Sequence, residues 1–344
     1  MREPITSHRL NGLEPDNLLA FLALLGLLRS LELAHPNWRP KVYWALNESP
    51  LRPVLTTYGS TTEGMVCDAA VDGLRIFRQV LFPFRHELPG KEGLKKELPK
   101  KQDKPKSEKL RKALIRDRAH QRSLAKRCIM AQQVSRLDIE KRTVWRLRCD
   151  LVACSAANVI KKDKEIETTP MKLTSGNMPF IGTMFELADK CEAGDLQKSI
   201  FGNWEYANKG NSLRFSPDEA QRYAYRATDP SDEGAYTEFA ATALSGLGLL
   251  SFPMVERGSY WKMPAYSGTS SKGRICWPIW GSEGGNGSSL STIEAMLRAL
   301  PLEQGKSPKL FGTGAMVTTA RRYALDPNQP YYGNISRAEI EVIA

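Results

Sequence analysis

Residues 17–33, NLLAFLALLGLLRSLEL, determine the fold more than any other stretch of this chain. The segment is apolar on nearly every helical face. A helix that is hydrophobic all round must be enclosed on all sides, so we expect this one to run through the centre of its domain. Pro15 and Asp16 precede it, and Asp16 is placed to cap the free amides of the first turn. The continuous apolar run, residues 18–28, is too short to span a bilayer, so we expect a buried core helix and no membrane partner.

Shorter patterns follow along the chain. Apolar residues at helical spacing predict helices at 63–80, 174–190, 236–250 and 291–300. Alternating apolar residues predict strands at 41–46, 143–152 and 315–325. Residues 251–289 are rich in Gly, Pro, Ser and Trp, which predicts short strands joined by turns. Together these patterns predict an α+β fold. Its expected parts are a helical N-terminal part at 1–90, a basic helical insert at 91–148, and a turn-rich mixed part at 149–344.

The insert holds essentially all of the net positive charge. Residues 91–148 contain twenty Lys and Arg against seven Asp and Glu, a balance of +13, whereas the whole chain carries +11. The remaining residues therefore sum to −2. A solvated surface loop is the simpler explanation of a charge run. A localised excess within a near-neutral chain is nevertheless the electrostatic pattern expected of a protein that binds a phosphate backbone.

The insert has two parts of different character. Residues 91–109 contain almost no apolar side chain, so we expect them to be mobile or ordered only by a ligand. The part up to residue 137 carries an apolar stripe at helical spacing, which leaves basic side chains to point outward. The candidate phosphate contacts are Lys104, Lys106, Lys109, Arg111, Lys112, Arg116, Arg118, Arg122, Lys126 and Arg127.

No recognisable catalytic or metal-binding motif stands out. The four histidines are far apart, and the six cysteines include no C-x-x-C pair, so we expect no cofactor, no metal and no disulfide framework. Reduced thiols and the absence of a signal peptide predict a cytoplasmic location. The acidic residues Asp229, Asp232, Glu233 and Glu238 offer carboxylates to a hard cation, but a turn with solvated charges is the simpler interpretation.

A glycine-rich stretch, residues 281–289, resembles a phosphate-binding loop but lacks the Gly-Lys-Ser/Thr ending. Nucleotide hydrolysis is therefore not expected. Glycines let a backbone approach a DNA groove closely, and an asparagine can read a base edge. Gly284, Gly285, Asn286 and the nearby Lys272 are accordingly candidates for reading a short DNA motif, and a flexible hairpin connection is the alternative.

Three segments resemble a known family. They are residues 10–29 (LNGLEPDNLLAFLALLGLLR), residues 174–188 (TSGNMPFIGTMFELA), and residues 215–253 with RYAYRATDPS and LGLLSFP. Each is similar to a segment of the large subunits of type I CRISPR systems, subtype G (formerly U). The resemblance covers about half the chain in patches, and none of its motifs is catalytic.

The resemblance implies a non-catalytic subunit of an RNA-guided surveillance complex (Cascade). Such a subunit binds target double-stranded DNA, recognises a flanking motif (the PAM) and works beside guide RNA, other effector subunits and a separate helicase-nuclease. Two alternatives remain open. The chain is an assembly subunit whose insert binds guide RNA or an acidic partner, or it is a nuclease with a carboxylate site around Asp229 and Asp232.

Overall fold

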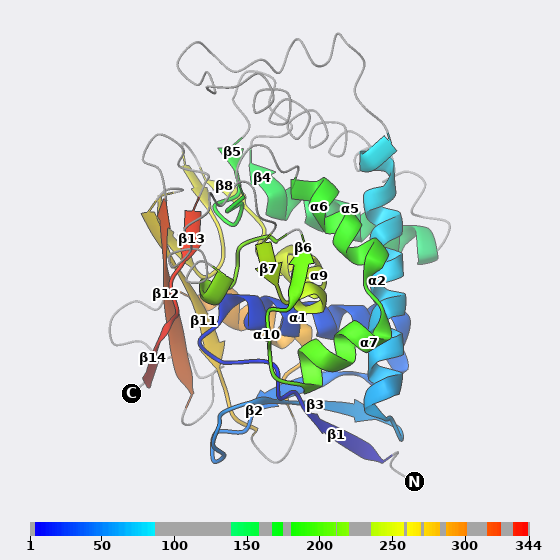
Figure 1. Cartoon of the computed structure of the whole chain (residues 1–344). Helices are drawn as coiled ribbons and strands as arrows, with labels where there is room; N and C mark the ends of the chain where they lie inside the picture. The colour runs from blue at the N-terminus through cyan, green and yellow to red at the C-terminus, as the bar shows by residue number, and fades with distance from the viewer. Residues whose placement is uncertain are drawn as a thin grey trace.

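The computed structural model describes residues 4–86, 139–157, 167–174, 180–210, 212–219, 235–257, 260–269, 272–282, 287–300, 315–324 and 333–342. The fold is α+β, as the sequence patterns predicted. Figure 1 shows helices gathered in the middle and on the right, a large sheet on the left, and a small sheet below. The helices and helical turns are α1 (Leu18–Ala34), η1 (Pro36–Trp38), α2 (Glu63–His86), α5 (Ile139–Ser155), α6 (Phe180–Lys190), α7 (Ala193–Leu196), η3 (Gln197–Phe201), α9 (Phe239–Gly248), η4 (Leu249–Ser251) and α10 (Leu290–Ala299).

The described strands form five sheets. A three-stranded antiparallel sheet has the order β1-β3-β2, and a five-stranded antiparallel sheet has the order β10-β11-β12-β13 with β14 also paired to β12. Three further sheets are two-stranded: β4-β5, β6-β7 and β8-β9. The strands are β1 (Ile5–Arg9), β2 (Lys41–Trp44), β3 (Pro53–Tyr58), β4 (Ala156–Ala157), β5 (Glu167–Thr168), β6 (Asn208–Gly210), β7 (Ala235–Thr237), β8 (Val255–Arg257), β9 (Tyr260–Lys262), β10 (Tyr266–Gly268), β11 (Lys272–Ile279), β12 (Met316–Ala324), β13 (Gly333–Ile335) and β14 (Glu339–Val342).

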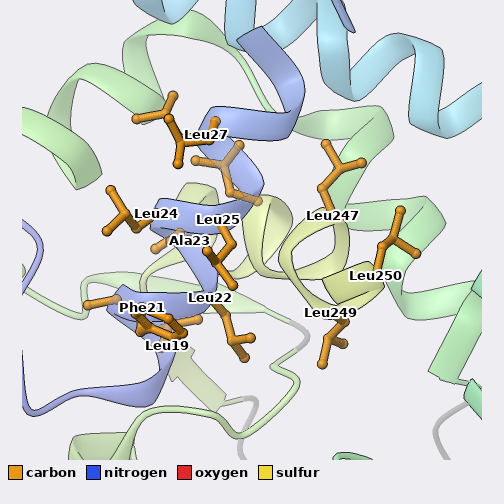
Figure 2. Packing of buried hydrophobic residues seen from close by; sticks show 14 of the residues in the cluster. Leu19, Phe21, Leu22, Ala23, Leu24, Leu25, Leu27, Leu247, Leu249 and Leu250 are labelled. Atoms are coloured by element: carbon orange, nitrogen blue, oxygen red, sulfur yellow. The ribbon is translucent and has the colours of Figure 1, made fainter. Parts of the chain in front are cut away.

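Helix α1 is the central element, as its all-round apolar pattern predicted. Every residue from Leu18 to Leu28 is buried. Figure 2 shows its leucines extending in several directions into the surrounding core. The predicted cap is wrong by one residue: the Asn17 side chain, not that of Asp16, accepts a hydrogen bond from the Leu19 amide at 3.0 Å. Asp16 instead pairs with Arg337.

Helices α1 and α9 touch through their backbones. A Cβ atom placed on Gly26 would lie 1.9 Å from the Leu244 carbonyl oxygen, and one placed on Gly248 would lie 2.0 Å from the Leu22 carbonyl oxygen. Each helix therefore contributes a glycine to the crossing, and neither position has room for a side chain. This close approach brings the leucines of the two helices together: in Figure 2, Leu247 of α9 and Leu22 and Leu25 of α1 lie around the crossing.

One hydrophobic core joins the front and back of the chain. It runs from Leu10 to Ile335 and includes residues of α1, α2, α9 and β11. The expected parts at 1–90 and 149–344 therefore share one core. The expected boundary at 148/149 falls inside α5.

The strand predicted at 143–152 is wrong as well, since these residues belong to α5. The misleading feature was the alternation of Val144, Arg146 and Arg148 with apolar neighbours. The buried positions show the true period: Leu147, Leu151 and Cys154 recur at four and three residues and lie on one helical face. Tertiary burial of this face overrides the local alternation.

Most other predicted elements are confirmed with shifted ends. Strand β2, helices α2, α6, α9 and α10, and strand β12 lie where the patterns placed them, and short strands fill much of 251–289. The patterns missed β1 and β3, which complete the small sheet. Within the described ranges, no helix combines the length and the apolar character needed to cross a membrane.

Two tryptophans connect the large sheet to the N-terminal part of the chain: Trp277 of β11 contacts α1, and Trp280, just after β11, contacts β2. Trp277 is fully buried, stacks on Phe21 with ring centroids 5.7 Å apart, and donates from Nε1 to the Pro15 carbonyl at 2.9 Å. Trp280 donates from Nε1 to the Val42 carbonyl at 2.9 Å. Trp277 thus joins the inner face of the sheet to α1, and Trp280 joins the end of β11 to β2.

Candidate nucleic-acid interface

Lys272, the described member of the predicted motif-reading set, opens β11 on its outer face. The strand alternates: Gly273, Ile275 and Trp277 are buried on the inner face, whereas Lys272 and Arg274 are exposed. In Figure 1 the labelled helices lie to the right of β12, so they cover only the inner face of the sheet. The outer face therefore presents the side chains of alternate residues to solvent at this end.

Strand β12 places two more exposed side chains beside them. In the antiparallel register, Lys272 lies opposite Tyr323 and Arg274 lies opposite Arg321. All four residues are exposed, and the intervening Arg322 is buried and donates to the Pro170 carbonyl. We call Lys272, Arg274, Arg321 and Tyr323 the cationic sheet face.

The cationic sheet face contains an unfavourable pair. Side chains directly opposite on an antiparallel sheet have Cβ atoms about 4.5–5.5 Å apart, and like charges there destabilise the sheet. Arg274 and Arg321 occupy such positions. Arg321 reaches the Glu339 carboxylate only at 3.9 Å, with the two side chains 64% and 73% exposed. An ion pair this open contributes little. Among the described residues, no ion pair involves Lys272 or Arg274.

The rest of the outer face has a different character. Cys276 is buried and Thr319 is half-buried, so the side chains of the outer face become less exposed toward the middle of the sheet. Strand β14 then places Glu341 opposite Val317 and Glu339 opposite Thr319, which makes that side acidic. The favourable location for an anion is therefore the β10–β12 end, where the three cations lie together.

The described ends of the glycine-rich stretch and Lys272 lie at opposite ends of β11. Lys272 begins β11, whereas Gly281 lies past its other end, eight residues of strand away or about 25 Å. Both ends of the loop are bound to β2, because Trp44 N donates to the Trp280 carbonyl and Val42 pairs with Ser288. Gly284, Gly285 and Asn286 lie outside the described residues.

The predicted phosphate contacts also lie outside the described residues, from Lys104 to Arg127. The same holds for Asp229, Asp232 and Glu233. Glu238 is described, and it is not a solvated turn residue. Its buried carboxylate accepts from Ser199 Oγ at 3.2 Å and from the amides of Glu205 and Tyr206 at 2.8 and 2.5 Å. It has a structural role at the start of α9.

A second buried carboxylate, Glu219, lies nearby in the same polar network. Thr237 Oγ1 donates to it at 2.6 Å, and Ser212 Oγ donates to its other oxygen. Burial raises the pKa of the Glu219 carboxyl from 4.5 to about 7, although both hydroxyl hydrogen bonds act in the opposite direction. The folded chain therefore holds a proton here that the unfolded chain releases near pH 4.5.

The raised pKa of Glu219 predicts that the protein becomes less stable as pH rises. Between pH 4.5 and 7 the folded state binds more protons than the unfolded state, so the free energy of unfolding falls by up to about 3 kcal/mol. Glu219→Gln should remove most of that difference. Urea unfolding at pH 5 and pH 8 measures it, and Glu341→Gln, on the exposed strand β14, is the matched control. An equal pH dependence in wild type and Glu219→Gln would contradict the assignment.

A third charged cluster joins distant parts of the chain. The Arg337 guanidinium donates to Glu14 at 2.9 Å, to both oxygens of Asp16 and to Asp218 at 2.7 Å. It ties β13–β14 to the segment before α1. In the part of the chain that the structure describes, no group of three or more His, Cys, Asp or Glu side chains is arranged to hold a metal ion.

Comparison of the whole chain with protein-family models, with curated proteins and with solved structures finds no match.

Proposed function

We propose that this chain is a nucleic-acid-binding subunit of a CRISPR RNA-guided DNA surveillance complex, with no bond-breaking role of its own. The observation that carries the proposal is the charge distribution: +13 within residues 91–148 of a chain whose total is +11. The resemblance of three segments to type I subtype G large subunits supports the same assignment. Three exposed cations of the cationic sheet face, outside the insert, add to it.

In this proposal the insert binds phosphates of target double-stranded DNA. Phosphate contacts position a protein on the duplex but carry no sequence information. Sequence is read mainly by pairing with the guide RNA, and the subunit recognises only a short flanking motif. Gly284, Gly285 and Asn286 remain candidates for that recognition. Lys272 is also a candidate, and it belongs to the cationic sheet face. Other effector subunits and a separate helicase-nuclease complete the complex.

A cytoplasmic location belongs to the same proposal. The described cysteines, Cys67, Cys149, Cys154, Cys191 and Cys276, are all free thiols. Burial raises the pKa of the Cys67 thiol to about 12, and it also raises the pKa of Cys154, Cys191 and Cys276. Unreactive reduced thiols suit a reducing compartment.

The test is reversal of four insert charges, Arg111, Lys112, Arg116 and Arg118, to glutamate in the assembled complex. If six to ten insert cations contact phosphates, raising salt from about 50 to 200 mM weakens wild-type binding by about 10³–10⁵-fold. We expect the variant to bind target DNA far more weakly and with a shallower salt dependence, measured by fluorescence anisotropy.

The matched control reverses four exposed cations elsewhere, Arg75, Lys190, Lys198 and Arg298, with the same change in net charge. We expect it to retain most of the affinity. Unchanged DNA affinity in the insert variant would remove the insert from the mechanism. Retained DNA affinity with loss of complex assembly would favour the alternative, an assembly subunit whose insert binds guide RNA or an acidic partner.

A further inference from the structure

We propose that the cationic sheet face binds single-stranded nucleic acid, with a base stacked on Tyr323 and phosphates held by Arg274 and Arg321. The inference rests on the proposed function, because it assumes that the anionic ligand of this face is nucleic acid. It concerns residues outside the insert, so this inference and the proposed function can be tested independently of one another.

The pairing of two arginines indicates an anionic ligand. Arg274 and Arg321 lie directly opposite one another on adjacent strands, and both are exposed. Lys272, two residues from Arg274, projects from the same face. An anion between the two guanidinium groups would relieve their repulsion, and guanidinium groups match phosphate oxygens in geometry. The acidic residues Glu339 and Glu341 disfavour phosphates on the β14 side. We therefore expect the single-stranded nucleic acid to bind at the β10–β12 end of the sheet.

Tyr323 indicates that the ligand has an accessible base. Its side chain is 42% exposed on a regular strand, directly opposite Lys272, and among the described residues it makes no aromatic ring contact. Exposed aromatic rings on sheets, flanked by cations, bind single strands because successive bases stack on them. A duplex keeps its bases stacked within the helix, so this ring favours single-stranded over double-stranded ligand.

The sheet is suited to present these groups rigidly. Between Arg321 and Tyr323, Arg322 points inward and its Nε donates to the Pro170 carbonyl at 2.8 Å. On β11, Trp277 is stacked on Phe21 of α1. The spacing of the Cα atoms of Tyr323, Arg274 and Arg321 is therefore set by strand register and does not depend on loop conformation.

The experiment uses the full chain and fluorescein-labelled oligonucleotides: a 15-mer of dT, a 15-mer of rU and a hairpin duplex. Because the insert also binds nucleic acid in the proposed function, anisotropy is measured in wild type and in the background with Arg111, Lys112, Arg116 and Arg118 reversed. Tyr323→Leu should weaken single-strand binding about 5- to 150-fold and leave duplex binding unchanged. Tyr323→Phe, which keeps the ring, should retain affinity.

Two further readouts separate stacking from charge. Arg274→Gln with Arg321→Gln should lower the slope of log affinity against log salt by about 1.4, the value for two lost single-strand phosphate contacts. Ultraviolet crosslinking of a bromodeoxyuridine strand should label the peptide that contains Tyr323. The dT and rU arms show whether DNA or RNA is preferred.

The opposite results overturn the inference. Unchanged single-strand affinity in Tyr323→Leu, or an equal loss for duplex, would exclude base stacking. Crosslinks confined to 91–148 would place the single strand on the insert. Loss of complex assembly with intact nucleic-acid binding would make the face a protein contact. If the sheet variants have no effect while insert reversal abolishes binding, the proposed function stands and this inference fails.

Discussion

Gly26→Leu should leave almost no folded protein, and Gly26→Ala should lower the free energy of unfolding by about 3 kcal/mol or more. The Cβ of any residue at this position would lie 1.9 Å from the Leu244 carbonyl oxygen, so α1 and α9 would have to separate. Separation would open the centre of the core, because α1 is buried along nearly its whole length. Since domains are stable by only about 5–15 kcal/mol, the larger substitution is expected to exceed the whole stability of the fold.

Gly64→Ala is the matched control for Gly26→Ala. Gly64 also lies in a helix, α2, but it is exposed, and its added Cβ would have only Thr62 Oγ1 within 4 Å, at 3.9 Å. This substitution should leave the stability unchanged or raise it slightly, because alanine loses less conformational entropy than glycine on folding and Gly64 lies in the first turn of α2. Urea unfolding followed by circular dichroism measures both variants. Equal stability of the two would show that the helices do not cross at Gly26.

Trp277→Ala should cost about 3–5 kcal/mol of unfolding free energy. The indole is fully buried between β11 and α1, where it stacks on Phe21 and donates to the Pro15 carbonyl. Its removal leaves a cavity under the sheet and an unpaired carbonyl at the segment before α1. Thermal or urea unfolding measures the loss.

Trp277→Phe separates the contribution of ring packing from that of the Nε1 hydrogen bond. It keeps an aromatic ring against Phe21 but removes the hydrogen bond from Nε1, so it should cost less than Trp277→Ala. Trp261, which is only half-buried, provides the comparison: Trp261→Ala should have a smaller effect than Trp277→Ala. A larger loss at Trp261 than at Trp277 would mean that β11 is not anchored through this ring.

The predictable parts of the fold are those whose sequence pattern is compatible with only one structural environment. A segment such as 17–33, apolar all round, can only be enclosed, and the structure confirms its central place. Helix α5 was not predictable by the same reasoning, because Val144, Arg146 and Arg148 alternate with apolar residues as a strand would. Its helical period becomes visible only when burial of Leu147 and Leu151 is known. Local pattern and tertiary packing disagree there, and packing prevails.

The candidate site was predictable only in part. Lys272 was identified, but Arg274, Arg321 and Tyr323 were missed because strand register brings them together across about 50 residues of sequence. The spacing contained a signal: Lys272 and Arg274, like Arg321 and Tyr323, are two residues apart and so share a strand face. Pairing of the two strands cannot be read from either segment alone.

The central position of α1 has a consequence during synthesis. Its glycine contact and much of its enclosing surface come from α9, which begins at Phe239, about 200 residues after α1 ends. At about 5–20 residues per second, a ribosome takes roughly 10–40 s to make that interval. During this time a helix whose first eleven residues carry no charged side chain lacks its α9 partner, so the nascent chain is then at its most vulnerable to aggregation. Chaperones that shield the emerging chain should improve its yield most when they engage before translation reaches α9.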